Sequence, residues 1–129
     1  MGTSYVSFQD RCEAFNDSDL LMVLRLASNS MGQRGVLAEL ANAWEEAIRN
    51  HAPGVVDVPL GNLAEQSTER GQLAALLLEL ETEVSNFGDF VPLPYLREHC
   101  NMRGIRYLAG YPTSRIVAAI KRLRDLLEA

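Results

Sequence analysis

The sequence predicts an all-α protein, a compact orthogonal or irregular bundle of about six or seven helices that forms one domain over residues 1–129. Its length of 129 residues is typical of one domain. Its composition, 47% hydrophobic and 22% charged, is that of an ordinary globular protein. Apolar residues recur at spacings of three and four along most of the chain, which is the pattern of amphipathic helices.

Two helices are expected at the N-terminal end. Phe8, Cys12 and Phe15 are spaced by four and three residues, which predicts a short helix over Ser7 to Asn16. The polar run from Asn16 to Asp19 predicts a break and a new helix N-cap. The segment from Leu20 to Ala27 is apolar nearly all round, so it is expected to be a central helix, with a buried strand as the alternative.

An amphipathic helix and a long helix follow. The apolar stripe between Val36 and Asn50 predicts the first, which ends at Pro53 and Gly54. Residues 55–60 are expected to be a loop, with a short edge strand as the alternative. The long helix spans Leu63 to Phe87, with Asn62 as its expected cap and a bend at Gly71. Its apolar seam consists of Leu73, Leu77, Leu80, Val84 and Phe87.

The C-terminal part predicts three more helical stretches. Proline in a first turn favours a short helix over Pro94 to Asn101. A brief helical stretch over Ile105 to Ala109 is expected to stop at Gly110. The last helix is capped by Thr113 or Ser114, and its apolar stripe faces the core.

Charge is the main hint about function. The first 92 residues hold 5 Lys and Arg against 14 Asp and Glu, a net of −9, whereas the remainder holds 7 against 3, a net of +4. Net charge of this kind influences the choice of partner and the association rate. Folding can mix the two segments, so the asymmetry in sequence need not become two surface patches.

The acidic segment favours a protein-binding module whose partner is a basic protein. Small acidic immunity proteins that neutralise basic nuclease toxins in bacteria have the same general character, by analogy of charge and fold alone. The expected contact surface is a set of exposed carboxylates, Glu39, Glu45, Glu46, Glu79, Glu83 and Asp89.

The alternative is a regulator that binds nucleic acid. A short helix, a turn and a basic last helix form the outline of a helix-turn-helix, with Arg115, Lys121, Arg122 and Arg124 as the contacts. Such a regulator would be a homodimer through one of the leucine seams. The acidic net charge and the unusual turn at Gly110 argue against it.

No motif predicts an enzyme, a cofactor or a metal site. His99 and Cys100 are neighbours on a helix and point about 100° apart, so a buried thiol beside an exposed imidazole is expected instead of a catalytic pair. The turn at residues 32–35 is at most a generic anion site. An unrecognised enzyme would be revealed by a deep pocket lined by Tyr95, His99, Tyr107 or Tyr111.

The sequence predicts a cytoplasmic protein with no membrane partner. Its apolar runs are shorter than a membrane span, and its first residues do not resemble a secretory signal. Cys12 and Cys100 are expected to be reduced thiols.

Overall fold

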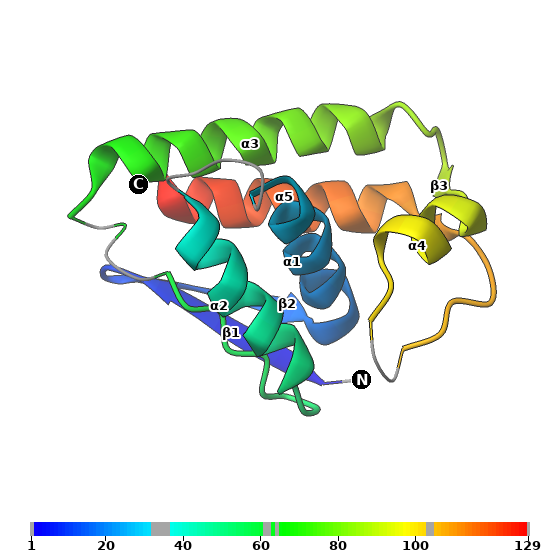
Figure 1. Ribbon diagram of the computed structural model, residues 1–129, viewed down its shortest axis with the longest axis horizontal. Helices are drawn as coiled ribbons and strands as arrows, with labels where there is room; N and C mark the ends of the chain where they lie inside the picture. Colours follow the sequence, from blue (N-terminus) through cyan, green and yellow to red (C-terminus); the bar gives the residue numbers. More distant parts are fainter. Residues whose placement is uncertain (1, 32–36, 61–62, 64, 103–104, 129) are drawn as a thin grey trace.

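A computed structural model describes residues 2–31, 37–60, 63, 65–102 and 105–128. These residues form five helices and two small antiparallel sheets of two strands each (Figure 1). The elements in chain order are β1 (Thr3–Phe8), β2 (Arg11–Asn16), α1 (Asp17–Met31), α2 (Ala38–Arg49), α3 (Ser67–Ser85), β3 (Phe90–Val91), α4 (Leu93–His99), β4 (Tyr111–Pro112) and α5 (Thr113–Leu127). The expected cap Asn62 and the turn at residues 32–35 lie outside the described residues.

The prediction of an all-α bundle of six or seven helices is wrong, because the fold is mixed α and β. The residues 7–16 expected to form a helix instead form the end of β1, the turn and all of β2, and the two strands pair as a hairpin. Alternate residues of β1, Ser4, Val6 and Phe8, are buried, which is the period of a strand. Three apolar residues spaced by four and three are too few to define a helix when β-branched and aromatic residues favour a strand.

Helix α1 is the central helix, as predicted. Figure 1 shows it crossing the middle of the molecule, and it packs against α2, α3, α4, α5 and β2. Its residues from Leu20 to Leu24 are all buried. The predicted N-cap is confirmed, because the Asn16 side-chain oxygen accepts hydrogen bonds from the backbone amides of Ser18 and Asp19.

Helices α3 and α5 lie side by side along the long axis of the molecule (Figure 1). The long helix is shorter than predicted, and it continues through Gly71. Four members of its leucine seam, Leu73, Leu77, Leu80 and Val84, are buried within the chain, and Phe87 is partly buried. The seam therefore serves the core of the protein itself.

The segment around α4 forms one end of the molecule. The helical stretch expected over residues 105–109 is absent: Ile105 forms an isolated bridge with Met102, and the chain then runs without helix to β4. Five residues that end at a glycine give too few internal hydrogen bonds to hold a helix. β4 pairs with β3, the strand that directly precedes α4. Gly110 lies just before β4, and a Cβ on it would lie 2.9 Å from the Val91 carbonyl oxygen of β3.

A buried carboxylate joins the hairpin, α1 and the segment that follows α2. Asp17 is 2% exposed, and it accepts hydrogen bonds from the Ser4 hydroxyl at 2.5 Å and from the Gly54 amide at 2.7 Å. The Ser4 hydroxyl also accepts a bond from the Val56 amide at 2.9 Å. This network fixes where residues 54–56 begin their path beneath α2.

No helix in the described part of the chain is long and apolar enough to cross a membrane.

Candidate functional site

The six predicted acidic contact residues divide between two parts of the molecule. Glu39, Glu45 and Glu46 lie on α2, which packs on α1. The other three lie on α3, which packs on α5, or in the turn that follows it: Glu79, Glu83 and Asp89. They therefore supply two separate groups of charge.

Of the three predicted carboxylates on α2, one is paired with a basic side chain and two are not. Glu45 lies 3.8 Å from the guanidinium of Arg25, with side-chain exposures of 39% and 18%. Glu39 and Glu46 are exposed, and neither forms an ion pair with another described residue. Their charge is therefore presented to solvent.

A groove runs between α2 and residues 55–59. Its volume is about 380 Å³, and Ala43 and Ala47 of α2 leave it open because their side chains are short. The indole nitrogen of Trp44 donates to the Pro59 carbonyl oxygen at 2.7 Å, which holds the far wall of the groove against the helix. Val55, on the same wall, is 64% exposed.

One carboxylate from each wall lines this groove. Glu46 comes from α2 and Asp57 from the extended segment, and both are exposed. In the described part of the chain, neither has a basic partner. Asp57 was not among the contact residues predicted from the sequence, although it lies between two buried residues, Val56 and Val58, and this alternation turns its side chain outward.

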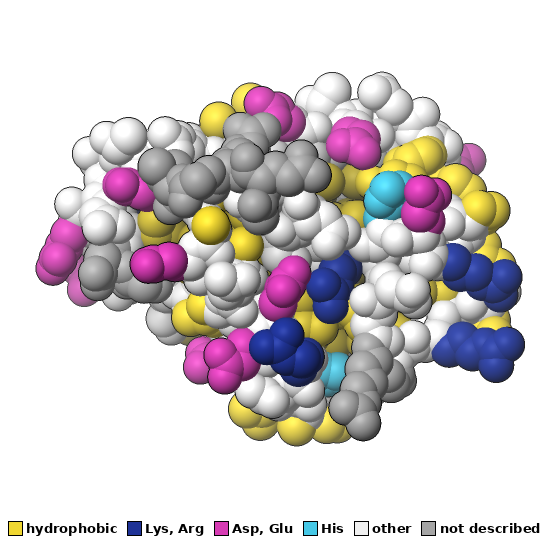
Figure 2. Space-filling model, viewed as in Figure 1, with side chains coloured by type: hydrophobic (Ala, Val, Ile, Leu, Met, Phe, Trp, Pro, Cys, Tyr) yellow, Lys and Arg dark blue, Asp and Glu magenta, His cyan; other side chains and the backbone are white. Residues whose placement is uncertain are grey.

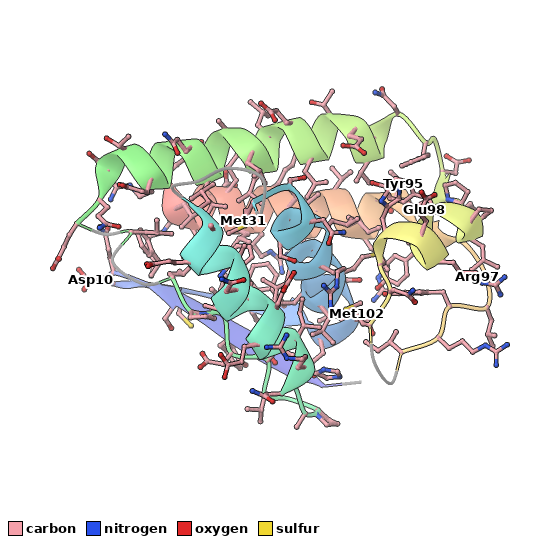
Figure 3. The ribbon with its side chains drawn as sticks, viewed as in Figure 1. Asp10, Met31, Tyr95, Arg97, Glu98 and Met102 are labelled. Atoms are coloured by element: carbon pink, nitrogen blue, oxygen red, sulfur yellow. The ribbon has the colours of Figure 1, made fainter. Side chains whose placement is uncertain are left out.

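A second hollow, the polar cleft, lies between α1, α3 and α4. Its volume is about 520 Å³, and it brings the predicted residue Glu83 together with Tyr95 and His99. The Tyr95 hydroxyl donates to a Glu83 carboxylate oxygen at 3.1 Å. Burial, followed by the charge of Glu83, raises the pKa of Tyr95 above its ordinary value, so the phenol keeps its proton. Figure 3 shows Tyr95 between α4 and α3.

Only part of the aromatic set proposed for an enzyme pocket meets in this cleft. Tyr111 instead donates a hydrogen bond to Asp19 at the start of α1. Burial raises the pKa of both Tyr107 and Tyr111. Cys100 is buried beside the half-exposed ring of His99, as expected, and its burial raises the thiol pKa to about 12. A thiol with this pKa stays protonated and is a poor nucleophile.

Two basic residues of α5 are bound to a carboxylate of α3. Arg124 lies 3.0 Å from Glu81, and Lys121 lies 3.8 Å from the same side chain. Glu81 is only 12% exposed, so this pairing belongs to the packed interface between the two helices.

The other two predicted nucleic-acid contacts are also engaged within the chain. Arg115 pairs with Asp19 at 3.0 Å and lies over the ring of Tyr111. Arg122 donates to the Ala14 carbonyl oxygen of β2 at 2.7 Å. The helix-turn-helix outline is not formed, because residues 105–109 are not helical.

No group of three or more His, Cys, Asp or Glu that could hold a metal ion occurs among the described residues. The chain matches no protein-family model, no curated protein and no solved structure.

Proposed function

We propose that this protein is a binding module that docks on a basic protein surface through the groove between α2 and residues 55–59. The observation that carries the proposal is the pair of exposed carboxylates, Glu46 and Asp57, one on each wall of a groove that also exposes Val55. A cationic side chain entering the groove would meet both charges, and apolar contact with Val55 would add affinity. Acidic residues around an apolar centre match the general anatomy of a protein interface.

The way in which the chain uses its basic residues supports this proposal. All four basic side chains of α5 named above are held by carboxylates or backbone carbonyls of the same chain. Near α2, the three unpaired carboxylates Glu39, Glu46 and Asp57 outnumber the one unpaired described cation, Arg49. Complementary charge of this kind raises the association rate with a basic partner, most strongly at low salt.

The proposed partner is defined by its chemistry alone. A basic nuclease toxin would satisfy it, as in the immunity-type hypothesis, and so would any other protein with a basic surface. Nothing in the described part of the chain favours the nucleic-acid alternative. We propose a cytoplasmic location, which is supported by the exposed free thiol of Cys12, since such thiols persist in reducing compartments.

The proposal is tested by reversing the charge of both groove residues. The double variant Glu46→Lys/Asp57→Lys should weaken binding to an amphipathic peptide rich in arginine and lysine by at least about tenfold, because it turns attraction in the groove into repulsion. Affinity is measured by titration calorimetry at low and at high salt. Wild-type affinity should fall as salt rises.

The matched control is Glu65→Lys/Glu128→Lys, which makes the same change in net charge at exposed positions outside the groove. This control should keep most of the wild-type affinity. Equal loss in the two double variants would show that the peptide responds to net charge alone, and it would contradict the groove as the contact site.

A further inference from the structure

The polar cleft between α1, α3 and α4 has the composition of a small-ligand site. Two buried leucines, Leu26 of α1 and Leu80 of α3, form apolar surface within it. Its volume of about 520 Å³ is in the ordinary range for ligand pockets, which combine apolar walls with a few placed polar groups. The cleft shares no lining residue with the α2 groove.

The described polar side chains of the cleft include hydrogen-bond acceptors and one negative charge, and the Ser30 hydroxyl and the His99 ring can donate as well as accept. Glu83 contributes a carboxylate, and Ser30 contributes a hydroxyl. The Asn29 amide nitrogen donates to the His99 carbonyl oxygen at 2.7 Å, which leaves the amide oxygen as the free end of that side chain. Among the described residues, no lysine or arginine lines the cleft. A ligand that pairs with the Glu83 carboxylate and the Asn29 amide oxygen brings donors and positive charge.

Tyr95 fixes the orientation of the carboxylate. Its hydroxyl bonds one oxygen of Glu83, Oε1, so the other oxygen remains for a ligand. The Tyr95 ring is held by two aromatic neighbours, with ring centroids 4.6 Å away for Phe87 and 4.4 Å away for His99. A carboxylate held in one orientation loses less conformational entropy when it binds a ligand.

We infer that this cleft binds an alkyl guanidinium group, with the planar head at Glu83 and the Asn29 amide oxygen and the apolar stem along Leu26 and Leu80. A guanidinium presents several donors in one plane, which suits two separate acceptors better than a single ammonium does. The same chemistry is offered by a free small guanidine and by an arginine side chain of a protein partner. The cleft recognises the group in either form.

The test titrates the ¹⁵N-labelled full chain with agmatine, and with N-(4-aminobutyl)urea, which keeps the ammonium of agmatine and replaces the guanidinium by a neutral urea. Agmatine should shift the amide signals of Asn29, Glu83 and His99, whereas the urea should leave them in place. Glu83→Gln, which removes the charge at an exposed position, should weaken agmatine binding about ten- to a hundredfold. Glu79→Gln, one turn earlier on α3 and outside the cleft lining, should bind as the wild type does.

A blocked tripeptide with arginine in its centre separates the two sources of the group. Binding of both probes assigns the cleft to the guanidinium wherever it is found, binding of agmatine alone assigns it to a free ligand, and binding of the peptide alone assigns it to a protein partner. The inference is overturned if neither probe shifts these amides at millimolar concentration, or if Glu83→Gln binds as tightly as the wild type. The Glu46 and Asp57 side chains stay intact in these variants, so this result leaves the groove proposal untouched.

Discussion

At the scale of single residues, the buried Asp17 carboxylate determines how the acidic groove is built. It connects β1 to residues 54–56, which lead directly into the groove wall that carries Asp57. Its position in the first turn of α1 is also favourable, since a negative charge there interacts well with the helix dipole. Gly2 lies against the same network, and a Cβ on it would come 2.3 Å from the Gly54 nitrogen.

Replacing this carboxylate should destabilise the whole fold. Asp17→Ala leaves the Gly54 amide and the Ser4 hydroxyl without their acceptor, so we expect the free energy of unfolding to fall by about 2–4 kcal/mol. Urea denaturation followed by circular dichroism measures the change. Asp10→Ala, in the exposed hairpin turn that Figure 3 labels, should change it by less than about 0.5 kcal/mol. An equally small effect of Asp17→Ala would mean that the network contributes nothing to stability.

The sequence identified some site residues and missed others for a physical reason. Four of the lining residues were predicted: Glu46, Glu83, Tyr95 and His99. Charged and aromatic residues at helical spacings can be recognised from the sequence alone. The proximity of Glu83 to Tyr95 was not predicted, since the two residues meet only where α3 and α4 come together. Asp57 was missed because residues 55–60 form no regular element, and only their packing under α2 turns this carboxylate into the groove.

At the scale of elements, the long helices and the short helix α4 were predictable, whereas the strands were not. Helices α1, α2, α3 and α5 lie within one to four residues of their expected bounds, because each repeats its apolar period over three or more turns. The hairpin and the β3–β4 pair depend on contacts between strands that the sequence does not show. The alternation of buried and exposed residues in these short strands is too brief to be distinguished from a helical spacing.

Helix α3 provides a prediction about helix stability. Gly71 lies within it, is exposed, and a Cβ built on it meets nothing within 4 Å. Gly71→Ala should therefore raise the free energy of unfolding by about 0.5–1 kcal/mol, because alanine is the better helix former. Thermal and urea denaturation measure the change.

Gly110→Ala is the matched control for this substitution. Its Cβ would lie 2.9 Å from the Val91 carbonyl oxygen, so the β3–β4 pair would have to shift, and a loss of about 1–3 kcal/mol is expected. A stabilised Gly110→Ala, or a destabilised Gly71→Ala, would show that the packing described for these two elements is wrong.

At the scale of the molecule, folding rearranges the charge asymmetry of the sequence. The basic C-terminal segment does not form one basic surface, because α5 uses its cations against α3, α1 and β2. Among the described residues, Arg49, Arg97 and Arg106 are the basic side chains without an ion pair or hydrogen bond. Figure 2 shows basic side chains at the edge beyond α4 and near the centre of this face, with acidic ones on both halves, and Figure 3 labels Arg97 at that edge.

The acidic groove along α2 is the proposed docking site of a basic partner. This proposal is tested most directly by following the amide signals of the ¹⁵N-labelled protein while the arginine- and lysine-rich peptide is added at low salt. The account predicts shifts concentrated at Ala43, Glu46, Ala47, Asn50, Val55 and Asp57, and their loss as salt is raised. Shifts confined to α5 or the hairpin, or no shifts at low salt, would contradict it.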